Sequence, residues 1–181
     1  FTLGKAGPEG VDYHVTQEND PGFFRRCVVN NAAYDYYSRC TATDLDIPEP
    51  PSGLRFWIFP DIAASSCNML HHGAFMDNKL LQKYVGQYLS LIKVFLPDIT
   101  IGTKDQPTYA AIYSNVSHEL SHASHYTQVG NGFWSPYICY VLDSFVTQGG
   151  KAYGDGTGDN AGYCEIGEMW GYFMEASLFK D

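Results

Sequence analysis

Apolar residues recur every three or four positions in five stretches of the chain, which is the spacing of one face of a helix. In the first stretch, Asp20 and Pro21 are typical of a helix start, and Pro97 ends the second stretch. The apolar stripe of the second stretch predicts a helix that packs on the core. The five predicted helices cover about 21–38, 79–96, 108–128, 135–145 and 161–178.

Aromatic and β-branched residues predict a small mixed sheet between these helices. The clearest run is 54–59 (LRFWIF), which stops at Pro60, and weaker runs cover about 65–71 and 99–101. Glycine, proline and polar residues predict the irregular connections. These connections cover 1–21 (a lead-in), 41–53, 102–107 and 149–162. We therefore expect a single α+β domain over residues 1–181.

The composition narrows the classes of partner. The 181 residues carry a formal net charge of −9, and 45% of them are hydrophobic. A chain of this length and composition can bury a sizeable core. The negative charge argues against nucleic acid or an anionic membrane surface as the main partner. No run of about 18 apolar residues occurs, so we expect no membrane span, whereas the oligomeric state is left open.

The cysteines and the first residue bear on where the protein is found. Five cysteines lie at 27, 40, 67, 139 and 164, without the C-x-x-C spacing of zinc knuckles and redox motifs. The chain opens on Phe1 with no signal-peptide pattern, so we expect a fragment of a longer precursor. Few lysines, many tyrosines and the acidic balance favour an extracellular or periplasmic protein, surface-anchored if a preceding segment supplies the anchor.

The segment His118-Glu119-Leu120-Ser121-His122 spells H-E-x-x-H inside the third predicted helix. Two imidazoles four residues apart lie one turn apart on the same helix face and can chelate one metal ion. Glu119, next to the first histidine, can accept a proton from water at that metal. This pattern predicts a metal site with His118 and His122 as ligands and Glu119 as a base.

The helix predicted over 108–128 has two distinct faces. Its apolar face consists of Ile112, Val116, Leu120 and Ala123. His118, His122 and His125 share another face, and two positions along a helix correspond to about 200° of rotation. We therefore expect the histidine face to point away from the core and into a cleft.

A catalytic zinc site usually has three protein ligands, so the third one must be found. His125 is the nearest candidate, but seven residues of unbroken helix separate it from His118 by about 10.5 Å. Metzincin enzymes break the helix at a glycine, in the pattern HExxHxxGxxH. This chain has His125 in place of that glycine and Gln128 in place of the last histidine, so the metzincin pattern does not fit.

The run Glu165-Ile166-Gly167-Glu168-Met169-Trp170-Gly171 offers two carboxylates on the last predicted helix. With it, residues 109–176 resemble the gluzincin zinc metallopeptidases, in which a downstream Glu completes the site. They also resemble small bacterial zinc peptidases with HELxHxxH helices. The resemblance implies a zincin-like fold and Glu168 as the third ligand, flanked by two small residues. Glu165 is the substitute, or a residue that orients a ligand.

The same resemblance leaves the partners of the ligands open. Thermolysin-like members carry an Asp four residues after the ligand Glu, to orient the first histidine. This chain has Tyr172 at that distance from Glu168 and Met169 at that distance from Glu165. His125 is expected to line the cleft or to support a ligand, and the four candidates for stabilising an oxyanion are His125, Tyr126, Tyr153 and Tyr172.

The resemblance implies a hydrolase that cleaves peptide bonds in a peptide or protein substrate with one zinc ion, Glu119 acting as base and then acid. Two rivals remain. One is a catalytically silent zincin-like module that binds metal, glycan or a protein partner. The other is a zinc hydrolase of a non-peptide amide.

Two further patterns favour ordinary structural roles. His71 and His72 are neighbours at the end of a predicted strand, where adjacent side chains point to opposite faces, so at most one could line the site. Residues 155–166 resemble a calcium loop, but an EF-hand needs Gly at position six and Glu at position twelve. Those positions hold Asn160 and Ile166, so we expect a plain loop.

Overall fold

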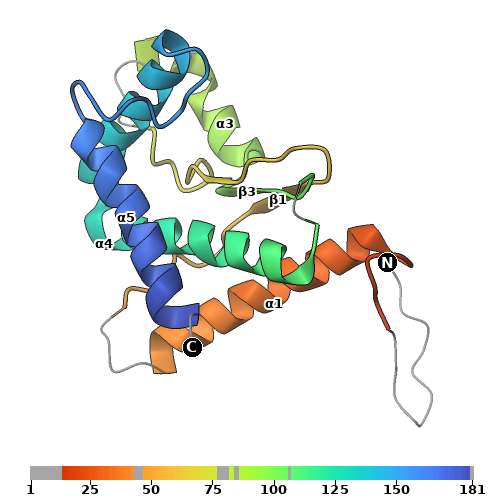
Figure 1. Ribbon diagram of the computed structural model, residues 1–181. Coiled ribbons are helices and arrows are strands. Elements are labelled where there is room, and N and C mark those ends of the chain that lie inside the picture. Colours follow the sequence, from red (N-terminus) through yellow and green to blue (C-terminus); the bar gives the residue numbers. More distant parts are fainter. Residues whose placement is uncertain (1–13, 43–46, 77–81, 84–85, 106, 180–181) are drawn as a thin grey trace.

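The computed structural model describes residues 14–42, 47–76, 82–83, 86–105 and 107–179 of the chain. Helices and a small sheet make up an α+β arrangement, as the sequence predicts (Figure 1). The elements in chain order are α1 (Pro21–Ala42), β1 (Phe56–Phe59), β2 (Ser66–Cys67), η1 (Gly86–Tyr88), α3 (Leu89–Phe95), β3 (Ile99–Gly102), α4 (Tyr109–Thr147) and α5 (Ala161–Phe179).

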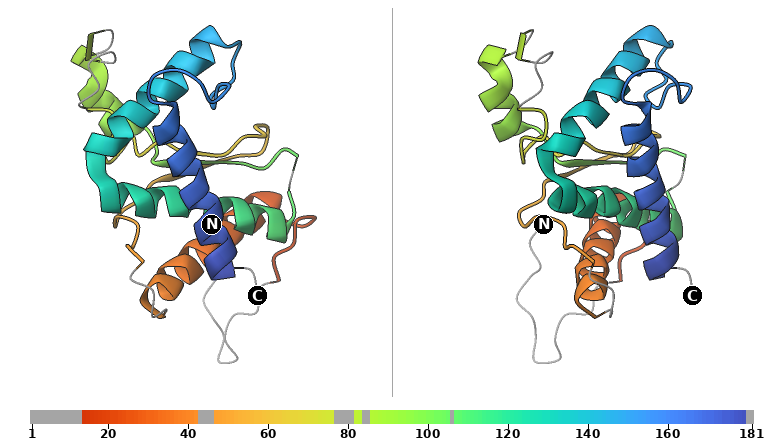
Figure 2. Two further views of the ribbon diagram at one scale, coloured as in Figure 1. Left: turned by 60° about the vertical axis from the view of Figure 1, so that its left-hand side comes forward. Right: turned by 90° about the vertical axis from the view of Figure 1, so that its left-hand side faces the viewer.

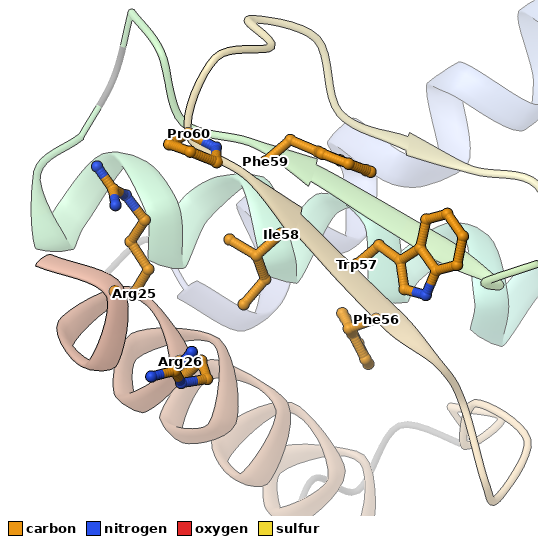
Figure 3. Close-up of a pocket in the computed structure, with 8 residues that line it drawn as sticks. Arg25, Arg26, Phe56, Trp57, Ile58, Phe59 and Pro60 are labelled. Atoms are coloured by element: carbon orange, nitrogen blue, oxygen red, sulfur yellow. The ribbon is translucent and has the colours of Figure 1, made fainter. Parts of the chain in front are cut away.

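The sheet is mixed and has three strands in the order β1-β3-β2. β1 pairs with β3 in parallel, and β2 pairs with β3 antiparallel. α4 packs against β2 and β3, while α1 and α5 pack against α4 (Figure 2). β1 is an edge strand, and a cavity lies between it and the beginning of α1 (Figure 3). The first part of α4 is thus enclosed by the sheet, α1 and α5.

The predicted apolar face of α4 is confirmed as the centre of the core. Ile112, Val116, Leu120 and Ala123 are each 0% exposed. They belong to one cluster with the equally buried Ile99 and Ile101 of β3 and with residues of α1. Burying a large aliphatic side chain stabilises a fold by about 1.5–3 kcal/mol, so this face fixes α4 to the sheet. Its opposite side is left to carry the histidines.

The helix ends follow capping chemistry. Asp20 accepts a hydrogen bond from the Phe23 amide (2.9 Å), which confirms the predicted start of α1. Thr108 caps α4 by accepting from the Ala111 amide (3.3 Å). None of the helices in the described part of the chain is long and apolar enough to cross a membrane. None of the five cysteines, all of which lie in the described part of the chain, forms a disulfide.

α4 combines two helices that the sequence predicts separately. Gly130 interrupts it with φ 64° and ψ −168°, and helical structure resumes directly afterwards. The sequence places the second helix only from 135 onwards, at Pro136, which instead lies inside α4. A glycine can turn the chain within one residue at positive φ, so no connecting loop is needed. The bend carries the second part of α4 towards α5, with which α4 shares its largest interface.

The helix predicted over 79–96 is confirmed at 82–83 and Leu89–Phe95, but a 3₁₀ turn interrupts it and its predicted buried face is wrong where the structure describes it. Residues 77–81 and 84–85 lie outside the described part, and the chain then forms the short η1 and α3. Tyr88 is 52% exposed and Phe95 66% exposed, whereas Leu89 is buried. A 3₁₀ turn advances 120° per residue, so η1 shifts the helical phase and the predicted stripe no longer faces the core.

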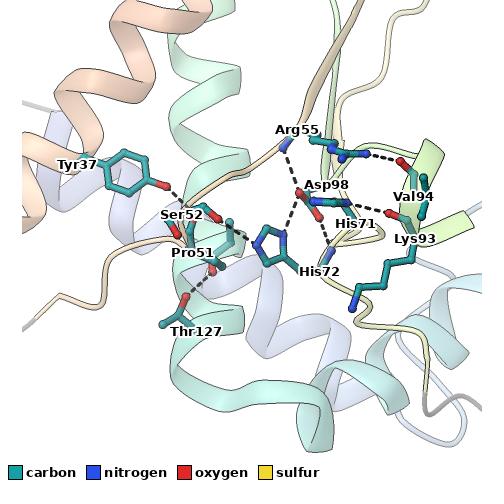
Figure 4. Close-up of polar contacts among 11 residues, drawn as sticks. Tyr37, Pro51, Ser52, Arg55, His71, His72, Lys93, Val94, Asp98 and Thr127 are labelled. Carbon is teal, nitrogen blue, oxygen red and sulfur yellow. Dashed lines mark hydrogen bonds and ion pairs between the residues drawn. The ribbon is translucent and has the colours of Figure 1, made fainter. Parts of the chain in front are cut away.

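Asp98, directly before β3, is a buried carboxylate that joins three segments (Figure 4). Its Oδ1 accepts from the His72 amide (2.9 Å), and its Oδ2 accepts from the Arg55 amide (3.1 Å) and lies 3.0 Å from His72 Nδ1. His72 Nε2 lies 3.2 Å from the Ser52 carbonyl oxygen. His71 Nδ1 lies 2.8 Å from the Lys93 carbonyl oxygen. Both histidines are therefore structural, in keeping with the role that the sequence favours.

We expect Asp98→Ala to lower the free energy of unfolding by about 3 kcal/mol. The change leaves two partly buried backbone amides and one imidazole without their acceptor. The measurement is urea denaturation followed by circular dichroism, with the exposed Asp61→Ala as the matched control. A loss below about 1 kcal/mol would show that water replaces the carboxylate easily and would contradict the prediction.

Candidate metal centre

α4 places the two histidines of the H-E-x-x-H segment one helical turn apart, with their rings edge to face at 4.8 Å between centroids. Their Nε2 atoms lie 3.2 Å apart. Two nitrogens bound tetrahedrally to one zinc ion at 2.0–2.1 Å are about 3.3 Å from each other. His118 and His122 therefore already have the spacing of two ligands of one ion.

Glu168 of α5, the third ligand that the resemblance implies, lies beside these two histidines. One of its carboxylate oxygens lies 3.7 Å from His118 Nε2 and the other 3.7 Å from His122 Nε2. One ligand atom from each of the three residues lies within 4.8 Å of the other two, so the group could hold a metal ion. His118 and Glu168 keep side-chain exposures of 17% and 19%, whereas that of His122 is 4%. Solvent therefore reaches the group from the side of His118 and Glu168.

One of the two glycines that flank Glu168 on α5 permits this close approach. A Cβ on Gly171 would lie 2.8 Å from His118 Cε1 and 3.1 Å from His122 Cε1, inside van der Waals contact. A Cβ on Gly167 would meet the Tyr137 ring at an ordinary 3.7 Å. Only Gly171 is thus required by the packing, because any side chain there would push against both imidazoles.

The carboxylate of Glu168 is held by a hydrogen bond that the sequence does not reveal. The Tyr137 hydroxyl, from the second part of α4, donates to Glu168 Oε1 at 3.1 Å. Burial by itself raises the pKa of Glu168, but the contacts with His118, His122 and Tyr137 lower it overall. Glu168 is therefore held in its ionised form, which is the form that binds metals.

His118 also has a partner on its other ring nitrogen. Glu175 Oε2 lies 3.7 Å from His118 Nδ1, and the Ser114 hydroxyl donates to Glu175 Oε1 at 2.6 Å. Ligand histidines generally direct their second nitrogen at such a carboxylate, which fixes the ring. Burial lowers the pKa of His118, but the three neighbouring glutamates, Glu119, Glu168 and Glu175, raise it overall. Glu175, three residues after Tyr172, thus lies where it can orient the His118 ring.

Glu175→Gln is expected to weaken metal affinity by about 10–100-fold, because the His118 ring loses the charge that orients it and strengthens its basicity. Zinc titration in competition with a chromophoric chelator measures the effect. Glu165→Gln is the matched control, since it makes the same charge change on the exposed side of the same helix. Equal affinities of the two variants would contradict a role for Glu175 at the site.

Glu119 is 6% exposed, follows His118 directly on α4, and interacts with the backbone of Cys67 in β2. Burial raises its pKa to about 8, with a further rise from the charge of Glu168. The charge of His118 and an interaction with the backbone of Cys67 act in the opposite direction. In the metal-free protein Glu119 is therefore protonated near neutral pH.

Glu119 and His122 make the stability of the metal-free protein depend on pH in opposite senses. Burial lowers the pKa of His122 from 6.5 to about 4, so the unfolded chain binds the extra proton between these values and stability rises with pH. For Glu119, between 4.5 and about 8, the folded chain binds the extra proton and stability falls as pH rises. Above pH 6.5 only the decrease due to Glu119 remains of these two effects.

We expect the free energy of unfolding of the metal-free protein to fall between pH 6.5 and 8. In the Glu119→Gln variant it should fall less steeply, by about 1 kcal/mol per pH unit. The reason is that the amide of the variant, unlike the Glu119 carboxyl, has no proton to release in the buried site. Thermal unfolding in the presence of a chelator, at half-unit pH steps, measures both proteins. Identical slopes for the two proteins would mean that Glu119 is not protonated in the fold.

The remaining predicted residues lie around the group formed by His118, His122 and Glu168, and their roles differ. His125 is 4% exposed, stacks on Trp170 (5.5 Å) and meets Phe133 edge-on (4.7 Å), so it supports the packing and is not part of the three-residue group. The Tyr172 ring contacts that of His118 at 4.9 Å. Glu165 is exposed, and its carboxylate lies beside Gly156 in the glycine-rich segment.

The tyrosines proposed as oxyanion donors differ in whether their hydroxyl groups are already engaged in a hydrogen bond. The Tyr126 hydroxyl donates to Asn131 Oδ1 (3.0 Å), whereas the Tyr153 side chain is 56% exposed. Partial burial, followed by the charges of Glu168 and Glu119, raises the pKa of Tyr153. Tyr140 holds this segment, because its hydroxyl donates to the Tyr153 carbonyl (3.2 Å) and accepts from the Gly156 amide (3.2 Å).

The expected cleft along the histidine face is wrong for most of that face. α5 covers it, and Ser117, His122 and His125 are buried. The sequence shows that the face is polar, but polar residues satisfied by neighbours can also be buried. Glu175 could have been found in the sequence, since seven residues after Glu168 correspond to two helical turns. Nothing in the sequence around Tyr137 indicates its hydrogen bond to Glu168.

Comparison of the chain with protein-family models, with curated proteins and with solved structures gave no match.

Proposed function

We propose that the protein is a zinc-dependent metallopeptidase of the gluzincin type, with His118, His122 and Glu168 as ligands of one zinc ion. The observation that carries the proposal is the convergence of two imidazole nitrogens and one carboxylate within 4.8 Å. Two histidines and one glutamate are a donor set of catalytic zinc sites, which keep a fourth position open. Harder cations such as Mg²⁺ and Ca²⁺ favour oxygen ligands.

The zinc ion would supply a Lewis acid that polarises the scissile carbonyl and lowers the pKa of bound water towards about 7. Glu119 receives the proton of the attacking water and delivers it to the leaving amine, so that it acts first as base and then as acid. Its burial beside His118 and Glu168 favours this role, because a buried carboxylate gives up and takes back a proton near neutral pH.

Two features of the surroundings support a peptide as the substrate. β2 is an edge strand, and the backbone of its Cys67 interacts with Glu119. An extended peptide that pairs with this edge would run past the ligands. Tyr153 is then the candidate donor to the oxyanion, since its side chain is exposed, and partial burial followed by the charges of Glu168 and Glu119 raises the pKa of its hydroxyl. The extracellular or periplasmic location stays a prediction from composition.

The test combines a metal assay with a peptide screen. Purified protein incubated with zinc and desalted should retain one zinc ion per chain by mass spectrometry, and it should cleave members of a broad peptide library. A chelator should stop cleavage and zinc should restore it. Folded protein that retains no stoichiometric metal would refute the site. Retained zinc with no peptide cleaved would instead favour a silent metal-binding module or the hydrolysis of a non-peptide amide.

A further inference from the structure

A cavity of about 540 Å³ lies between the beginning of α1 and the edge strand β1 (Figure 3). Its walls are Gly22, Arg25 and Arg26 on one side and residues 56–60 on the other. The metal centre is built from α4 and α5, and the strand next to Glu119 is β2, at the opposite edge of the sheet. The cavity is thus a separate feature that the proposed hydrolysis does not use.

The two arginines of this cavity have no carboxylate partner among the described residues. Arg25 makes one long hydrogen bond, from Nη1 to the Pro21 carbonyl oxygen (3.4 Å), and its Nε is buried without a partner. The Arg26 guanidinium lies over the Phe23 ring at 5.9 Å. A buried donor without an acceptor is unfavourable, so an anionic ligand would gain affinity here. In a chain with a net charge of −9, such a pair of cations is a local exception.

The other wall offers free backbone groups. The carbonyl oxygen of Arg55 accepts from the Ile99 amide (3.1 Å), and that of Phe59 accepts from the Thr103 amide (3.0 Å). Backbone groups of a strand alternate in direction with a period of two, so residues 55, 57 and 59 face β3. The amides and carbonyls of Phe56 and Ile58 therefore point away from β3, at the edge that lines the cavity.

Side chains of β1 also alternate between two faces. Phe56 and Ile58 pack on the core, on the side of the sheet that the helices cover. Trp57 is 42% exposed and meets Phe59 edge-on at 6.0 Å. An added strand would place every second side chain on the side of α1 and its arginines, and the others beside Trp57. The chemistry of the site thus fits acidic residues that alternate with apolar ones.

We propose that this cavity binds an extended acidic peptide segment as an additional strand on β1. Its backbone would pair with Phe56 and Ile58, and its carboxylates would bind Arg25 and Arg26. Main-chain hydrogen bonds to a sheet edge give such complexes their affinity, and the side-chain contacts give specificity. The site therefore recognises both an extended backbone and negative charge.

The test uses a fluorescein-labelled peptide of alternating Glu and Val and its counterpart of alternating Gln and Val. Both are titrated with the Glu119→Gln protein, so that cleavage cannot interfere, and binding is followed by fluorescence anisotropy. The acidic peptide should bind at least about tenfold more tightly than its counterpart, since charge-assisted hydrogen bonds are about twice as strong as neutral ones. Equal binding of the two peptides would overturn the proposal.

Variants then locate the binding. Arg25→Gln and Arg26→Gln, each added to that protein, should weaken binding of the acidic peptide by about tenfold. Lys151→Gln, the same charge change on an exposed residue beyond α4, should leave it within about twofold. If all three variants bind alike, the attraction is unspecific and the proposal fails. It also fails if anionic phosphatidylglycerol vesicles, and not the peptide, depend on the two arginines.

A backbone measurement separates strand addition from simple charge attraction. Hydrogen exchange followed by NMR should show that saturation with the acidic peptide slows exchange at the Phe56 and Ile58 amides. The Trp57 amide already faces β3 and should change little. Unchanged exchange at Phe56 and Ile58, with the peptide bound, would overturn the strand pairing.

Discussion

Glu119→Gln is expected to lower the rate of peptide cleavage by about 10³-fold while one zinc ion per chain is retained. Glutamine has nearly the shape of glutamic acid but cannot accept the proton of the attacking water. Glu119 is 6% exposed and burial raises its pKa to about 8, so a neutral side chain already suits its surroundings. The variant should therefore fold at least as well as the parent protein.

The measurement is the cleavage rate of one library peptide at fixed zinc saturation, with zinc content and thermal unfolding recorded on the same samples. Glu165→Gln serves as the control, because it removes an exposed carboxylate from α5 and should cleave normally. Normal cleavage by Glu119→Gln would show that another group accepts the proton. Loss of zinc from this variant would show that Glu119 belongs to the ligand set.

Gly171→Ala is expected to abolish stoichiometric metal binding, with a loss of affinity of at least about 10³-fold. The reason is that Glu168 would no longer reach the ion, so that its contribution to the metal affinity would be lost. The added Cβ would stand 2.8 Å from His118 Cε1 and 3.1 Å from His118 Nε2. To relieve these contacts the imidazoles and α5 would have to move apart, and Glu168 lies on α5. A single methyl group would thus separate the two halves of the site.

Gly167→Ala is the matched control, on the same helix and one turn earlier. Its Cβ would contact the Tyr137 ring at 3.7 Å, and alanine is the better helix former by about 1 kcal/mol. We expect this variant to bind zinc normally and to unfold at the same or a higher temperature. Calorimetric zinc titration distinguishes the two variants. Equal zinc affinity in both would mean that α5 does not approach the histidines as closely as described.

The residues nearest to the proposed chemistry could be predicted because their geometry is local. Four residues of helix fix the spacing of His118 and His122, whatever the rest of the chain does. Glu168 comes from a second helix, and the small residue at 171 allows that helix to come close to the histidines. The α+β class also followed from local periodicity.

What could not be predicted depends on contacts between distant segments. Tyr137 reaches Glu168 only because Gly130 bends α4 in a single residue, whereas the sequence suggests a loop between two helices. Similarly, the burial of the histidine face depends on how α5 lies across it. At Tyr88 the helical phase is altered by a 3₁₀ turn, which apolar spacing alone does not reveal.

The distance along the chain between the two histidines and Glu168 has a consequence for how fast the protein is degraded. His122 and Glu168 are 46 residues apart in sequence, so a shared ion would close a ring that includes the second part of α4 and the glycine-rich segment. An ion present at a thousand times its dissociation constant would stabilise this ring by about 4 kcal/mol. Zinc supply would then decide how much of the protein survives degradation, before any substrate is met.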